Sequence, residues 1–184
     1  MSHSIAVLVG SLRKESLNRK MAQTLMGLAP KELAPELVDL GELAMYNQDL
    51  DDHGDPPAPW SAFRQRIASS AGVLFVSPEY NRSVPGVLKN AIDIGSRPAG
   101  KSVWNGKPGA VITASPGTLG GFGANHHLRQ MMVALNVPMM QQPEAYISGA
   151  GKLFDEQGAL NNDSSREFLT KFMNAFNTWV SRFN

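Results

Sequence analysis

The chain has 184 residues, of which 42% are apolar and 18% charged, and its formal net charge is +1. This length and composition predict one soluble globular domain over residues 1–184, and the near-neutral charge argues against a polyanion-binding surface and against an acidic electron carrier. Because the chain has no cysteine, disulfides, thiolate nucleophiles, zinc–thiolate sites and iron–sulfur clusters are excluded.

The first half of the chain alternates apolar runs with helical patterns. Residues 5–9 form a continuous apolar run, which is typical of a parallel strand covered on both faces. This run is too short for a signal peptide or a membrane span, so we expect a cytoplasmic protein. Apolar residues then recur at helical spacing from Ser16 to Pro30, a short strand is expected over 37–40, and residues 41–59 are expected to form a long connection with solvated acidic side chains.

The second half of the chain repeats the alternation. Helices are expected before Gly72, from Pro85 onward and around Leu128, and strands over 73–76, 110–113 and 139–147. A capping box over 164–167 is expected to open the last helix. Five strand–helix repeats predict an α/β fold of three layers, doubly wound, with a five-stranded parallel sheet in the flavodoxin-like order 2-1-3-4-5.

Three loops follow predicted strands, and the carboxyl ends of parallel strands line one crevice where ligands bind. The first loop spans residues 10–18 and leads into a predicted helix. It combines hydroxyl and amide side chains with the cation of Arg13, beside the free N–H groups of a helix start. Such a loop suits a phosphate monoester.

The second and third loops have the composition of a site for a flat ring. The second, over 78–86, carries Pro78, Glu79, Tyr80 and Asn81, and its prolines stiffen a backbone that can present polar groups to a ring edge. The third, over 115–123, begins with Ser115, Pro116 and Gly117 and has three further glycines. Glycine is expected there to let the backbone approach a flat ring closely.

Two motifs carry a resemblance to a known family. They are Gly10-Ser-Leu-Arg-(x)2-Ser-Leu-Asn18 and Pro78-Glu-Tyr-Asn81-(x)-Ser-Val-Pro-Gly86-(x)-Leu-Lys-Asn-Ala-Ile-Asp93. With these motifs the chain resembles the NADPH-dependent FMN reductase family over nearly its whole length, and within it the branch of bacterial chromate and quinone reductases. The resemblance implies bound FMN and NADPH or NADH as co-substrate.

The resemblance also implies where the cofactor lies. The FMN phosphate is expected on Ser11, Arg13, Ser16, Leu17 and Asn18. The isoalloxazine and ribityl groups are expected along Pro78, Glu79, Tyr80 and Asn81, with Ser115, Pro116 and Gly117 at the other edge. No catalytic side chain and no metal are expected, because flavin N5 is the reactive centre.

The implied activity is hydride transfer from NAD(P)H to FMN, followed by transfer of two electrons to a quinone, flavin, chromate or similar small acceptor in a ping-pong cycle. The resemblance further implies a homodimer or homotetramer, with Arg129 and Glu144 expected at a subunit contact. No nucleic-acid or membrane partner is expected.

Two other functions have some support in the sequence. A non-enzymatic flavodoxin-like electron-transfer protein would share the fold, although such carriers are usually acidic. Residues 95–102 match the P-loop pattern of a phosphotransferase, but the match follows a predicted helix instead of a strand. His126 and His127 have no acidic residue at metal-ligand spacing on their predicted helix, so a surface or interface role is expected for them.

Overall fold

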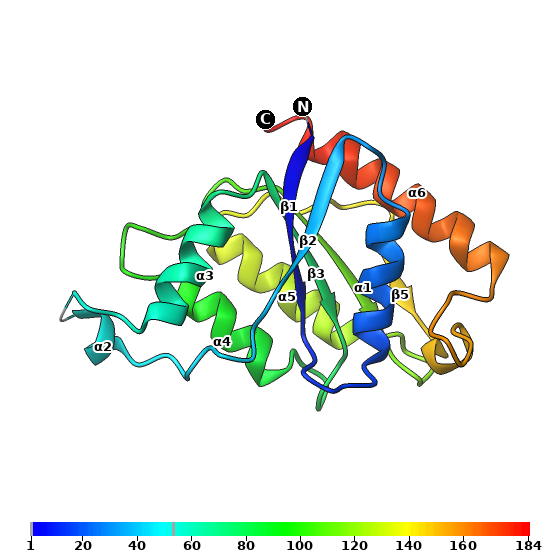
Figure 1. Cartoon of the computed structure of the whole chain (residues 1–184), viewed down its shortest axis with the longest axis horizontal. Helices are drawn as coiled ribbons and strands as arrows, with labels where there is room; N and C mark the ends of the chain where they lie inside the picture. Colours follow the sequence, from blue (N-terminus) through cyan, green and yellow to red (C-terminus); the bar gives the residue numbers. More distant parts are fainter. Residues whose placement is uncertain (1, 53) are drawn as a thin grey trace.

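The computed structural model describes residues 2–52 and 54–184 and has a parallel sheet at its centre (Figure 1). The order of the strands is β2-β1-β3-β4-β5, and every neighbouring pair is parallel, which confirms the expected topology. The strands are β1 (His3–Val9), β2 (Leu33–Val38), β3 (Gly72–Ser77), β4 (Gly109–Ala114) and β5 (Tyr146–Ile147).

Helices cover both faces of the sheet and make the outer layers of a three-layer fold (Figure 1). One face carries α1 (Leu17–Gly27) and α6 (Asp163–Val180), and the other carries α3 (Ala58–Ala68), α4 (Gly86–Gly95) and α5 (Phe122–Ala134). None of the helices in the described ranges combines the length and apolar character needed to cross a bilayer.

The alternation of side chains along β1 explains why the sheet has two cores. Ile5 and Val7 pack with α1 and α6, whereas Ala6 and Leu8 pack with α3, α4 and α5. Each of these four side chains is fully buried. A strand buried on both faces must be apolar at every position, and this is the reason for its uninterrupted apolar run.

The second strand begins earlier than the sequence predicts. It spans Leu33–Val38 instead of 37–40, and it pairs with β1 alone because it lies at the edge of the sheet. Pro35 lies within it, which an edge strand tolerates because one side of its backbone makes no ladder. The proline and Glu36 interrupt the apolar pattern, so the strand could not be recognised from its periodicity.

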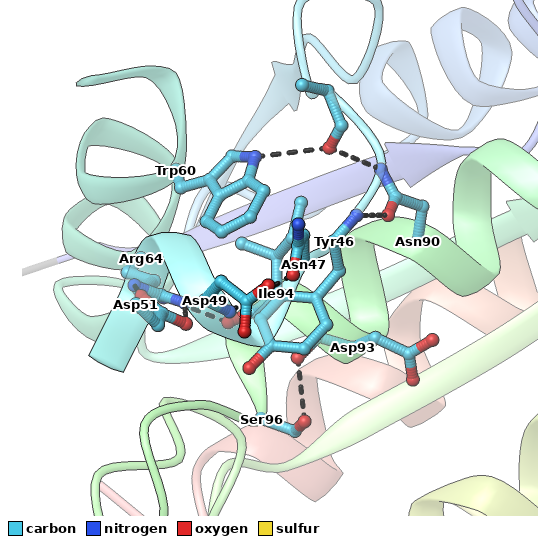
Figure 2. Close-up of polar contacts among 11 residues, drawn as sticks. Tyr46, Asn47, Asp49, Asp51, Trp60, Arg64, Asn90, Asp93, Ile94 and Ser96 are labelled. Carbon is cyan, nitrogen blue, oxygen red and sulfur yellow. Dashed lines mark hydrogen bonds and ion pairs between the residues drawn. The ribbon is translucent and has the colours of Figure 1, made fainter. Parts of the chain in front are cut away.

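The long connection after β2 is more ordered than expected. It contains the short helix α2 (Gln48–Asp52), and the carboxylate of Asp51 is buried against Arg64 of α3 (Figure 2). Asn90 of α4 binds the same connection, because its Oδ1 accepts from the N–H of Tyr46 at 2.8 Å (Figure 2). Its Nδ2 also donates to the carbonyls of Leu43 and Ala44. The expectation of a solvated acidic connection is therefore wrong for Asp51, and residue 53 lies outside the described residues.

Two further boundaries differ from the prediction. Helix α6 begins at Asp163, and its N-cap is Asn162, whose Oδ1 accepts from the N–H of Ser165 at 2.8 Å, so the expected capping box is wrong. The fifth strand has only two residues instead of the range 139–147, apart from one bridge between Met139 and Gly109. Pro143 lies between Met139 and β5, and it has no N–H to donate to a ladder of strand hydrogen bonds.

Candidate functional site

The three predicted loops meet at the carboxyl ends of β1, β3 and β4, around a cavity of about 260 Å³. Small-molecule sites usually measure about 300–1,000 Å³, so a cavity of this volume has room for only part of a ligand of ordinary size. The lining residues are Ser11, Arg13, Ser16, Leu17, Asn18, Pro78, Glu79, Tyr80, Ala114, Ser115 and Pro116.

Most of the sequence-predicted site residues are brought together here, with two exceptions. Asn81 and Gly117 do not line the cavity. Asn81 instead forms the tip of a hairpin, and Gly117 lies farther along its loop, where its carbonyl accepts from Gly149. Ala114, which the sequence analysis missed, does line the cavity because it is the last residue of β4.

The first loop provides the anion-binding end of the cavity. Ser16 is the N-cap of α1, and its Oγ accepts from the N–H of Arg19 at 3.2 Å. The N–H groups of Leu17 and Asn18 begin the helix and have no intrahelical acceptor. The guanidinium of Arg13 is exposed and has no partner among the described residues. A phosphate placed here would gain amide donors, the positive helix end and a cation.

Asn18 connects the first loop to the third and offers a direct test of the expected cofactor. Asn18 is 3% exposed, and its Nδ2 donates to the carbonyl of Ala114 at 3.0 Å. Its Oδ1 is buried without a hydrogen-bond partner. A buried acceptor that lacks a donor is costly. A ligand with hydroxyl groups next to a phosphate, as in the ribityl phosphate of FMN, would satisfy it.

The second loop is a tight hairpin that carries Tyr80. Tyr80 and Ser83 exchange two backbone hydrogen bonds of 3.0 Å each. Asn81 and Arg82 between them have φ values of 51° and 63°, a left-handed conformation that Asn tolerates but that is unfavourable for Arg82. Backbone strain of this kind persists only where the surroundings hold it, and it is frequent at ligand sites.

Two glycines of the third loop, Gly120 and Gly121, lie against protein and do not line the cavity. A Cβ on Gly120 would lie 2.7 Å from the backbone carbon of Tyr146, and one on Gly121 would lie 2.8 Å from the Cβ of Thr113. Gly121 also has φ of 79° at the N-cap of α5. The expectation that these glycines admit a flat ring is therefore wrong, because they let the loop pack on β4 and β5.

His126 and His127 both have side-chain partners on the surface. His126 Nε2 lies 3.1 Å from the hydroxyl of Tyr146, and His127 Nδ1 lies 2.9 Å from the hydroxyl of Ser83. Burial, together with a hydrogen bond to Glu144, raises the pKa of Tyr146 above its ordinary value. In the described ranges, no group of three or more His, Asp or Glu side chains could hold a metal ion.

Two competing features do not form a comparable site. A larger groove of about 570 Å³ lies between α4 and α5 and borders the end of the second loop at Ser83 and Val84, but no residue of the first or third loop lines it. The P-loop pattern begins at Gly95, which is the last residue of α4. It therefore does not follow a strand, as phosphate binding by that motif requires.

Comparison with known proteins relates this architecture to a family. The model of the NADPH-dependent FMN reductase family matches residues 3–152. A quinone reductase from Pseudomonas putida is 57% identical over 178 residues, which cover 97% of this chain and 95% of that protein. A 2-hydroxy-1,4-benzoquinone reductase from Burkholderia sp is 46% identical over 180 residues, covering 98% and 97% of the two chains.

A solved structure agrees with this relationship. The flavoenzyme FerB, an NAD(P)H:(acceptor) oxidoreductase from Paracoccus denitrificans, superposes with a TM-score of 0.92 at 40% identity, and the match covers 98% of each chain. The sequence match, the flavodoxin-like strand order and the cavity at the strand ends agree with one another. The chain belongs to the NADPH-dependent FMN reductase family.

Proposed function

We propose that the chain is an FMN-dependent NAD(P)H oxidoreductase that reduces quinones and related small acceptors by two electrons. Relatives named as quinone reductases and as an NAD(P)H-dependent FMN reductase support this activity. The proposal assigns residues 1–184 to one flavin-binding domain and the predicted cofactor-binding residues of the three loops to FMN.

The observation that carries the proposal is the buried, unpartnered Oδ1 of Asn18 beside the start of α1. A helix start binds one phosphate, and Asn18 Oδ1 would accept a hydrogen bond from a hydroxyl group next to it. FMN has one phosphate with a polyhydroxyl chain next to it. The cavity would hold this phosphate and part of the chain, with Arg13 supplying a charge-assisted contact.

When bound, FMN supplies the hydride and electron transfer, so the protein needs no acid or base of special pKa. The chain's own groups bind and orient it. Pro78 and Tyr80 on one side and Ser115 and Pro116 on the other bound the cavity. Because the cavity is open, the donor and the acceptor can use the same place in turn, which leads us to expect ping-pong kinetics.

The competing proposal, a non-enzymatic electron carrier, is less well supported. Carriers on this fold dock through an acidic surface, whereas this chain has a net charge of +1. The relatives with 57% and 46% identity are named as reductases. Steady-state oxidation of NADPH or NADH with a soluble benzoquinone distinguishes the two functions, since a carrier has no such turnover.

The cofactor itself is tested by release and identification. We expect the purified protein to be yellow, or to become yellow with FMN, and heat release followed by chromatography to yield FMN. Recovery of FAD, or a full chain that binds no flavin, would overturn the proposal. Initial rates at several quinone concentrations should give parallel double-reciprocal lines, and intersecting lines would argue against alternate use of one site.

Three finer assignments form part of the proposal. The acceptors include chromate as well as quinones and free flavins. The protein is a homodimer or homotetramer that works in the cytoplasm, without a nucleic-acid or membrane partner. Assays with chromate as the only acceptor test the range of acceptors, and measurements of the mass in solution test the oligomeric state.

A further inference from the structure

Helix α5 has no capping side chain of its own. Its N-cap is Gly121, and the third residue of the helix is Ala124. Where a helix has a capping side chain, that side chain accepts a hydrogen bond from the second or third N–H of the helix. Here the Oε2 of Glu79, from the loop after β3, accepts from the N–H of Ala124 at 3.1 Å. The cap of α5 therefore comes from the second loop of the cavity.

The remaining carboxylate oxygen of Glu79 also has a partner. Oε1 accepts from Nη1 of Arg82 at 3.3 Å. The Glu79 side chain is only 10% exposed, whereas that of Arg82 is 74% exposed. An exposed ion pair contributes little, so the contact with the helix start is the stronger restraint on Glu79.

Packing at Gly123 holds the same two segments together. A Cβ on Gly123 would lie 2.8 Å from the carbonyl oxygen of Arg82 and 3.0 Å from Oε2 of Glu79. The first of these atoms is backbone in a left-handed conformation, which cannot move without disturbing the hairpin. The hairpin and the first turn of α5 thus touch backbone to backbone, and the carboxylate of Glu79 bridges them.

This contact lies between two walls of the cavity. Glu79 itself lines the cavity from the second loop, together with Pro78 and Tyr80 on either side of it. Ser115 and Pro116 line it from the loop that leads into α5. A change in the spacing between the hairpin and α5 would change the spacing between these walls.

We propose that Glu79 is a positioning residue: its carboxylate ties the second loop to the start of α5 and thereby sets the separation of the walls that receive the flavin. This inference rests on the proposed function. It revises the expectation that the Glu79 side chain serves the cofactor directly, because both of its oxygens bind protein groups. Its role is to hold Pro78 and Tyr80 in place.

Four variants of the full chain separate positioning from direct contact. Glu79→Gln retains an oxygen acceptor for the N–H of Ala124 without the charge, and Glu79→Ala removes the acceptor. Gly123→Ala leaves Glu79 intact but forces the hairpin and α5 apart. Arg82→Ala is the matched control, since it removes only the exposed partner of Glu79.

The measurements are FMN affinity, the visible circular dichroism of bound FMN, and hydrogen exchange of the Ala124 amide in the FMN-free chain. We expect Glu79→Ala and Gly123→Ala to weaken FMN binding by about tenfold, because the loss of a helix cap has a free-energy cost of this size. We expect the same two variants to alter the visible circular dichroism of bound FMN. Glu79→Gln and Arg82→Ala should stay within about threefold of the parent. The Ala124 amide should exchange faster only in Glu79→Ala and Gly123→Ala.

Several results would overturn the proposal. If Glu79→Gln weakens FMN binding as much as Glu79→Ala while the Ala124 amide stays protected, the carboxylate contacts the ligand itself. Unchanged FMN affinity in Gly123→Ala would show that the spacing between the hairpin and α5 does not affect FMN binding. This test does not depend on whether Glu79→Ala folds. If the parent chain binds no FMN, the proposed function fails, whereas the exchange measurement still decides whether Glu79 caps α5.

Discussion

Asp51 and Arg64 form a bidentate ion pair, in which Nη1 of Arg64 lies 2.8 Å from Oδ1 of Asp51 and Nη2 lies 2.6 Å from Oδ2 (Figure 2). The two side chains are 3% and 12% exposed, respectively. The Nε of Arg64 also donates to the carbonyl of Ile94 at the end of α4. One guanidinium therefore joins α2, α3 and α4, far from the three loops of the cavity.

Asp51→Asn should lower the free energy of unfolding by about 3 kcal/mol, because it leaves a buried guanidinium without its charge partner. Urea denaturation measures this loss. Asp49→Asn, on the exposed side of the same helix, is the control and should cost less than about 0.5 kcal/mol. Equal effects of the two substitutions would mean that the ion pair contributes nothing.

Arg13→Ala should weaken FMN binding by about 1.5–3 kcal/mol, or more than roughly tenfold in Kd, because a phosphate would lose a charged donor. The fold should be unaffected, since the exposed Arg13 side chain has no partner among the described residues. Fluorescence titration of FMN measures the change. Lys14→Ala, which removes a neighbouring exposed cation outside the cavity lining, is the control. An unchanged affinity in Arg13→Ala would leave Arg13 as an ordinary turn residue.

The protein should be at least a dimer in solution, so light scattering over a dilution series should give twice the chain mass of 19.9 kDa or more. A species of the monomer mass with full activity would contradict this prediction. Arg129 is the predicted contact residue, although it also bonds within the chain to Asn125 and to the carbonyl of Met140.

Because of these internal bonds, the test at Arg129 needs a matched pair of variants. Arg129→Met and Arg129→Glu both lose the bonds to Asn125 and Met140, but only the second reverses the charge. If Arg129 lies at a subunit contact, Arg129→Glu should dissociate the oligomer more strongly than Arg129→Met, and the difference should shrink at high salt. Identical oligomers at both salt concentrations would place Arg129 outside the contact.

Lys107 should make stability depend on pH in the alkaline range. Its Nζ donates to the carbonyl of Ala68 at the end of α3 and to that of Ser70 just after the helix, and burial lowers the pKa of Lys107 below its ordinary 10.5. Between these two pKa values the unfolded chain binds more protons than the folded one, so this residue makes stability rise with pH.

Replacing Lys107 by Met should remove that rise. Urea denaturation of the parent and of Lys107→Met at about pH 8 and about pH 10 should show the parent gaining stability relative to the variant at the higher pH. All other titrating groups are shared by the two proteins, so they cancel in the comparison. A difference that does not change with pH would contradict the prediction.

The parts of the fold that were predictable from sequence are those whose cause is local. Strands β1, β3 and β4 are buried on both faces, so each is a continuous apolar run, and the loops after them meet because parallel strands end at the same edge. The meeting of the first and third loops at Asn18 and Ala114 follows from this topology.

The parts that were not predictable depend on partners distant in sequence. The burial of Asp51 requires Arg64, and the order of the connection around Tyr46 requires Asn90, 44 residues away. The third-loop glycines were interpreted from composition as a place for a ligand. Only the structure places Thr113 against Gly121 and the backbone of Tyr146 against Gly120.

The two edges of the sheet have a consequence for how copies of the chain can associate. The free backbone N–H and C=O groups of an edge strand can pair with a strand of another molecule unless the edge strand is short or interrupted. At one edge β5 has only two residues, and at the other β2 contains Pro35 and the charged Glu36, which pairs with Arg66. Neither edge offers a long, regular row of free backbone groups. Self-association by strand addition is therefore disfavoured, and we expect any oligomer of this chain to be built from its helices and loops.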